Sequence, residues 1–218
     1  MKGLLFTNFY LVHRSILVYT LIGIGVTAFC LKLTGGAYAI FSAITLGLVI
    51  TMPVWEILKV EAQSGYNKYV LTLPVSRKNI IQSYYLVYFL VVVIGIILFV
   101  GIFYVYGLFS EVSIDLSLFQ TIAFAILSML TLGAIIFPLI FMLGEEKSDF
   151  ILLLSLLFMG LVVNSLRLGV YSLIEQPPLL KFNLDPLKHV PLILLLIGIL
   201  IFLISFFISL FIYCKKEF

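Results

Sequence analysis

Charged residues are scarce in this chain: 11% of its 218 residues are Asp, Glu, Lys or Arg, whereas 63% are hydrophobic. This balance, with a mean hydropathy of +1.27, excludes an ordinary soluble domain and is typical of an integral membrane protein. The formal charge of +3 comes without a basic stripe interleaved with aromatic residues, so no nucleic-acid partner is indicated.

Cysteine and histidine are also rare, with two of each. Cys30 and Cys214 are expected at opposite faces of the membrane, so they cannot pair within one subunit. His13 and His189 are expected on opposite faces as well, and no cluster has metal-ligand spacing. The motifs HExxH and GxSxG and a Gly-rich phosphate loop are missing, so we expect no catalytic residue, no metal site, no bound cofactor and no ATP hydrolysis by this chain itself.

Long apolar runs recur along the whole sequence, and each is near the ~20 residues that a membrane-crossing helix needs. Their uniform apolarity favours helices over barrel strands, which would alternate polar and apolar residues. The sequence therefore predicts an all-α integral membrane protein with one six-span domain over residues 1–218. The expected spans are residues 15–33, 37–58, 84–108, 118–143, 150–173 and 190–213.

The positive charges predict the orientation. Nine of the 13 Lys and Arg residues fall on the side of the two termini: Lys2, Arg14, Lys59, Lys68, Arg77, Lys78, Lys147, Lys215 and Lys216. The positive-inside rule then places both termini and the loop 59–82 in the cytoplasm. Residues 1–14 are expected to form a short interfacial helix. A cleaved signal peptide ending near Ala37-Tyr38-Ala39 is the alternative, but the apolar core is longer than a typical signal.

The loop 59–82 has the pattern of a helical elbow beneath the membrane. Apolar residues recur at steps of three or four and mark one helix face: Leu58, Ala62, Tyr66, Tyr69 and Leu73. The opposite face carries Lys59, Glu61, Gln63, Asn67 and Lys68. The pair Ser64-Gly65 favours a bend between two short helices.

The far end of the elbow has its own stop and start signals. Pro74 ends the second short helix because the residue before a proline is disfavoured in helical conformation. Ser76 is placed to cap the helix that begins at Arg77 and becomes the third span. Taken alone, the elbow is either a protein contact surface or a simple connection between two spans.

Several segments resemble the membrane subunits of type-two ABC exporters, particularly the small six-span bacterial permeases. The matching residues are Glu56, Glu61, Ser64 to Tyr69, Leu73 to Arg77, Ile80 and Tyr84, with Met1 to Leu5 and Phe9-Tyr10. The likeness is strongest to the subgroup that includes exporters of phenol-soluble-modulin-like peptides. It implies that the elbow contains a coupling helix that docks on an ATPase.

The resemblance assigns the coupling role to two cytoplasmic segments. The elbow supplies Glu61, Ser64, Gly65, Tyr66, Asn67, Lys68, Tyr69, Leu73, Pro74, Ser76 and Arg77, and the turn 144–149 supplies Glu145 and Glu146. Ser148 or Asp149 is expected to cap the fifth span. The implied partners are two copies of an ATP-binding subunit carrying ATP and Mg, a second permease of the same or a related kind, and membrane lipid.

The implied function is ATP-driven export of amphipathic peptides or other hydrophobic cargo through a dimeric pathway. The alternative is the six-span substrate-binding component of an energy-coupling-factor uptake transporter, which matches in size but does not need the elbow. A membrane enzyme or a structural membrane protein also remains open.

Few polar residues interrupt the spans. Glu56, Asn164 and Arg167 are candidate pathway-lining residues, although Arg167 is near enough to the outer surface to extend its side chain toward water. Ala43 with Gly47, and Ser205 with Ser209, have the spacing of small-residue helix contacts. For the proline-containing outer segment 174–190, the resemblance implies a re-entrant pair of short helices, whose irregular backbone is tolerated where it is buried in protein or faces water.

Overall fold

A computed structural model describes residues 2–34, 39–64, 76–109, 116–144, 147–175 and 186–215. These residues form long helices and contain no strand. The helices are α1 (Lys2–Thr34), α2 (Ala39–Ser64), α4 (Arg77–Phe109), α5 (Leu116–Leu143), α6 (Ser148–Glu175) and α7 (Pro186–Lys215).

Each of these six helices contains a stretch long and apolar enough to cross a membrane. The stretches are Ser15–Leu33, Ile40–Glu61, Arg77–Leu108, Phe119–Leu143, Ser148–Val170 and His189–Lys215. For the described residues, the prediction of an all-helical chain with six helices long and apolar enough to span a membrane is therefore confirmed. The third helix begins at Arg77, as the cap signal at Ser76 predicted, and its apolar stretch starts seven residues before the expected start of the span at residue 84.

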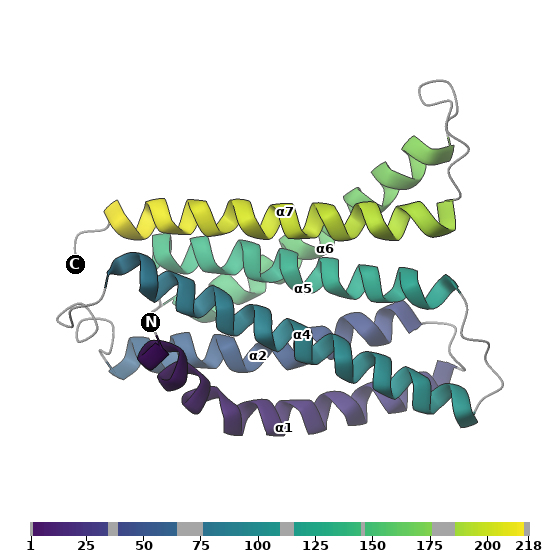
Figure 1. The fold of residues 1–218 in the computed structure, drawn as a ribbon, viewed down its shortest axis with the longest axis horizontal. Coiled ribbons are helices and arrows are strands. Elements are labelled where there is room, and N and C mark those ends of the chain that lie inside the picture. Colours follow the sequence, from purple (N-terminus) through teal and green to yellow (C-terminus); the bar gives the residue numbers. More distant parts are fainter. Residues whose placement is uncertain are drawn as a thin grey trace.

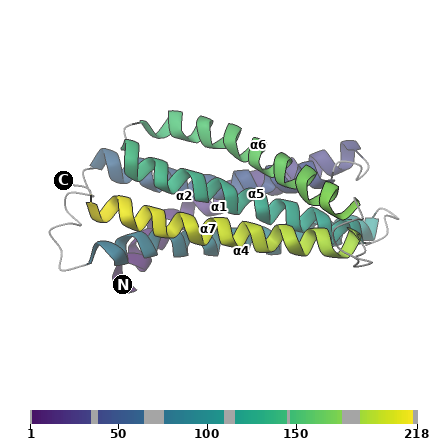
Figure 2. The same ribbon diagram turned by 90° about the horizontal axis from the view of Figure 1, so that it is seen from above.

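The helices form an elongated bundle in which α5 is central (Figure 1). The membrane-crossing stretch of α5 is 67% buried, against 17% for α6, and α6 follows one edge of the bundle (Figure 2). Both chain ends lie at the same end of the bundle, as an even number of spans requires. Residues 2–14 are helical and continuous with the first span, and Figure 1 shows these first turns of α1 bending away from the rest of the helix. That they lie in the membrane interface stays a prediction.

Close packing around α5 depends on glycine. The side chain of Met129 on α5 lies against Gly47 of α2 and Gly95 of α4, where an added Cβ would be 2.2 Å and 3.4 Å from the Met129 Cε. Gly133, also on α5, faces the ring of Tyr88 on α4. Glycine at position 47 leaves the space that the Met129 side chain occupies, whereas the helix contact expected at Ala43 and Gly47 stays a prediction.

Candidate functional site

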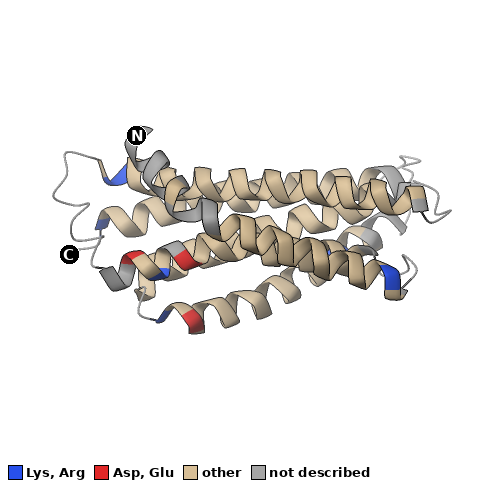
Figure 3. Cartoon of the chain, turned by 90° about the horizontal axis from the view of Figure 1, so that it is seen from below, with Lys and Arg blue, Asp and Glu red and all other residues tan. Residues whose placement is uncertain are grey.

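The charged residues of the bundle gather at its ends. Figure 3 shows the acidic residues toward the end that carries the C-terminus, with several Lys and Arg, while the long middle is almost uncharged. This is the end at which α2 stops at Ser64 and α4 starts at Arg77. The predicted coupling residues Gly65, Tyr66, Asn67, Lys68, Tyr69, Leu73 and Pro74 lie outside the described residues, as do Glu145 and Glu146 and most of the outer segment 174–190.

The start of α4 has the predicted cap. The backbone N–H of Asn79 donates to the Ser76 carbonyl oxygen at 2.9 Å and lies 3.4 Å from the Ser76 hydroxyl oxygen. Ser76 itself is outside the helix, and Arg77 is its first residue. A serine that satisfies the N–H three residues later fixes where the chain enters the helix, so α4 begins at Arg77, as the sequence predicted.

Glu61 lies differently from the prediction. It was placed on the polar face of the elbow, opposite the apolar face that carries Leu58, but it is 2% exposed, and its Oε2 accepts a hydrogen bond of 2.6 Å from the Tyr84 hydroxyl on α4. Leu58, three residues earlier and therefore on the same helix face, is also 2% exposed. The last turns of α2 thus stay packed against α4, and burial of the carboxylate is tolerated because a tyrosine donates to it.

A second carboxylate on α2 is bound in the same way by another helix. Glu56 is half-buried, and its Oε1 accepts a short hydrogen bond from the hydroxyl of Tyr19 on α1. The two glutamates, five residues apart, connect α2 to α1 and to α4. Neither tyrosine was predicted as the partner of a glutamate, although an acidic side chain in an apolar helix needs a donor and tyrosine is abundant in this chain, with 12 residues.

An ion pair joins the second predicted coupling segment, the turn 144–149, to the end of α2 that leads into the elbow. The Lys59 Nζ lies 2.8 Å and 2.9 Å from the two carboxylate oxygens of Asp149, in the first turn of α6. Gly144, with a φ of 87°, ends α5 in the left-handed conformation, and its N–H donates to the Ile140 carbonyl oxygen at 2.9 Å. This glycine C-cap turns the chain so that α6 starts beside α2.

A further polar contact joins α4 to α7. The Arg77 Nη1 donates to the Cys214 carbonyl oxygen at 3.1 Å. Carbonyls in the last turn of a helix lack intrahelical partners and carry partial negative charge, which suits a guanidinium. Polar side chains therefore connect the helix ends on this side of the bundle. One contact joins α2 to α6 and another joins α4 to α7. Glu61 and Tyr84 add a third contact, between α2 and α4.

The candidate pathway residues do not share one location. Asn164 and Arg167 are both exposed on α6, and the Arg167 guanidinium carbon lies 5.6 Å from the Phe124 ring centroid on α5. Glu56 instead faces α1. Within the described ranges, no three His, Cys, Asp or Glu side chains form a group that could hold a metal ion.

The interior contains a hydrogen-bonded cluster of one tyrosine and two serines that was not predicted from the sequence. The Tyr85 hydroxyl lies 2.8 Å from the Ser205 hydroxyl and 2.7 Å from the Ser209 hydroxyl, and Ser205 donates to the Ala134 carbonyl oxygen at 2.7 Å. Ser205 and Ser209 were predicted only as a small-residue contact. Two serines one turn apart in an apolar helix are also a signal for a hydroxyl partner on a neighbouring helix.

Comparison with known proteins identifies the family. The family model described as "ABC-2 family transporter protein" matches residues 3–214, nearly the whole chain. No curated protein and no solved structure matches. The family is a transport membrane component, not itself catalytic, and it implies an ATP-binding partner. The uptake-component alternative is not favoured, and the chain belongs to the ABC-2 family of transporter proteins.

Proposed function

We propose that this chain is the permease subunit of an ABC exporter and that the elbow between α2 and α4 receives the motion of the ATP-binding subunits. The family match supports the transporter class. The observation that best supports the coupling role is the buried Tyr84–Glu61 hydrogen bond of 2.6 Å, which lies where α2 and α4 meet the elbow. It joins the last turn of α2 to the second turn of α4.

This contact gives the elbow a way to move two helices together. A buried hydrogen bond to a charged group contributes ~1.5–3 kcal/mol, so a force applied to the elbow displaces α2 and α4 as one unit before it separates them. The Lys59–Asp149 pair then connects the same end of α2 to α6. Because its side chains are 40% and 74% exposed, this pair is weak and can open and close during a transport cycle.

The complete exporter in this proposal contains two such permeases, identical or related, and two ATP-binding subunits that hold ATP and Mg. Both termini and the elbow lie in the cytoplasm, because most positive charges are on that side. Amphipathic or hydrophobic cargo, of the kind represented by phenol-soluble-modulin-like peptides, suits a chain with 20 Phe and 12 Tyr residues. Glu56, Asn164 and Arg167 are the polar candidates for cargo contact.

Co-purification with the co-expressed ATP-binding subunit tests the coupling role. The variant carries Tyr66→Ala, Lys68→Glu and Tyr69→Ala in the elbow, and a control carries Lys181→Glu and Phe182→Ala in the segment predicted on the opposite membrane side. We expect the elbow variant to insert in the membrane but to lose the ATP-binding subunit and permease-stimulated ATPase activity, whereas the control keeps both. Equal association of the two variants would refute the assignment of the elbow.

A further inference from the structure

An apolar groove runs between α4 and α7 with α5 as its floor. Its volume is about 370 Å³, within the ~300–1,000 Å³ range of small-molecule sites. The lining residues are Gln82, Tyr85, Leu86, Phe89, Leu130, Ile199, Phe202, Leu203 and Phe206. Its outer walls are open to the surroundings of the bundle, because Leu86 is 43% and Leu203 is 49% exposed. The groove is therefore accessible from the hydrocarbon core of the bilayer.

The aromatic walls of the groove are held in place by polar contacts behind them. The buried Tyr85 presents its ring to the groove while its hydroxyl is engaged by Ser205 and Ser209. The ring centroids of Phe202 and Phe206 lie 5.1 Å and 5.2 Å from that of Tyr85. Because these rings pack against one another and hold their positions, the groove is formed before any ligand enters. Its surface is almost entirely carbon.

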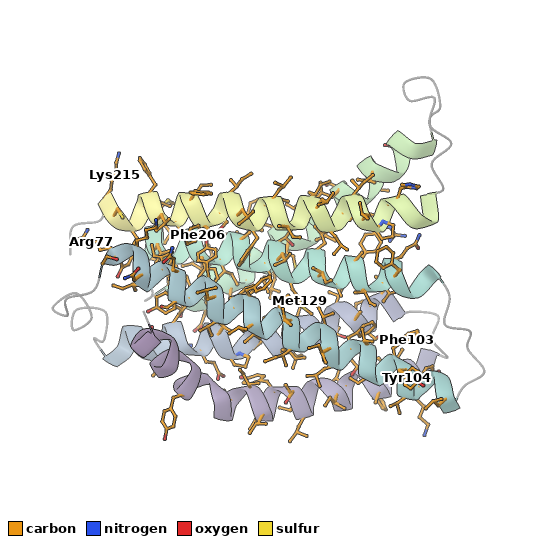
Figure 4. The ribbon with its side chains drawn as sticks, viewed as in Figure 1. Arg77, Phe103, Tyr104, Met129, Phe206 and Lys215 are labelled. Atoms are coloured by element: carbon orange, nitrogen blue, oxygen red, sulfur yellow. The ribbon has the colours of Figure 1, made fainter. Side chains whose placement is uncertain are left out.

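The end of the groove nearest the membrane surface is basic. Lys78 is exposed and precedes Gln82 by one helical turn, so it continues the row of α4 residues that line the groove. Arg77, bonded to the Cys214 carbonyl oxygen, lies between the ends of α4 and α7. Lys215 is exposed on α7, with its Nζ 4.1 Å from the Phe211 ring centroid. Figure 4 shows Arg77 and Lys215 at one end of the bundle and Phe206 further along it.

We propose that this groove binds an anionic phospholipid of the leaflet at the Arg77 end. One acyl chain lies along the aromatic walls, and the phosphate is held by Lys78 and Arg77. A zwitterionic headgroup would bring its own cation to these basic side chains, so an anionic headgroup is preferred. Basic sites between membrane helices are the usual way in which anionic lipids are recognised. This inference does not depend on the direction of transport or on the cargo.

Lipid titration followed by native mass spectrometry tests the headgroup part of the proposal. The delipidated protein is titrated with phosphatidylglycerol and, separately, with phosphatidylcholine of the same chains. Wild type should bind the first phosphatidylglycerol more tightly. Lys78→Gln should weaken that binding about fivefold and leave phosphatidylcholine unchanged, and Lys78→Arg should keep it. The control is Lys147→Gln, which replaces an exposed cation just before α6 and should bind like wild type.

A second variant tests the groove itself. Leu203→Trp fills the groove at an exposed position, so it should weaken binding of both lipids without preventing folding. Equal affinity of wild type for the two lipids, or equal effects of Lys78→Gln and Lys147→Gln, would overturn the proposal. It would also be overturned if Leu203→Trp left lipid binding unchanged and instead altered the oligomeric state, because the groove would then be covered by another protein chain.

Discussion

Replacing Gly133 by alanine tests the packing between α4 and α5. An added Cβ would lie 2.4 Å from Cε1 and 2.6 Å from Cζ of the Tyr88 ring, far inside van der Waals contact. The ring cannot easily move away, because Tyr88 is 3% exposed and its hydroxyl donates to the Met129 carbonyl oxygen at 2.5 Å. The substitution must therefore shift α4 relative to α5 or break this hydrogen bond.

The expected cost follows from these two possibilities. Overpacking a well-filled interior typically costs ~1–3 kcal/mol, and loss of the Tyr88 hydrogen bond adds ~1 kcal/mol. Gly101→Ala and Gly160→Ala are matched controls, because a Cβ at either position meets nothing within 4 Å. Alanine in place of glycine inside a helix is favourable by ~0.5–1 kcal/mol, so the controls should change stability in the opposite direction.

Unfolding in mixed detergent, with SDS as denaturant, measures the free energy of unfolding. Trp55 is the sole tryptophan of the chain and lines a small cavity together with Tyr88, so its fluorescence reports on this region. Gly133→Ala should unfold at lower SDS than wild type, and the two controls at equal or higher SDS. A Gly133→Ala protein as stable as the controls would show that the close approach of Tyr88 is wrong.

Two further predictions concern the end of the bundle at the elbow. Tyr84→Phe removes the hydroxyl that binds the buried Glu61 and should lower the free energy of unfolding by ~1.5–3 kcal/mol. The control Tyr104→Phe, at a 58% exposed position on the same helix, should change that free energy by less than ~0.5 kcal/mol. Equal effects of the two substitutions in the same fluorescence assay would contradict the buried contact. Lys59→Gln breaks the exposed pair with Asp149 and should cost less than ~1 kcal/mol, so a larger loss in that assay would mean that the pair is shielded from water.

Features set by neighbouring residues were predictable from the sequence. The spans follow from length and apolarity, and the start of α4 follows from Ser76, whose capping contact reaches only to Asn79. Local chemistry of this kind does not depend on how helices pack. The coupling role of the elbow is different, because it rests on resemblance and on residues outside the described ranges.

Features set by contacts between distant residues were not predictable. The position of Glu61 depends on Tyr84, which approaches it only because α4 packs along the end of α2. Ser205 meets Tyr85 across 120 positions of sequence, and helix periodicity alone does not select that pairing. In both cases the sequence shows a polar group that needs a partner, but the partner is chosen by the packing of the whole bundle.

Met129 gives the centre of the bundle a tolerance for movement. Its terminal methyl group lies between Gly47 and Gly95, so α2 and α4 both rest on one flexible thioether of α5. A methionine can change its side-chain torsions at little cost and keep a gap filled, where a branched side chain would hold one spacing. Small sliding motions of α2 and α4 over α5 can therefore occur without opening a void in the membrane interior, and a stiff residue at this position would make the bundle tighter but less able to change shape.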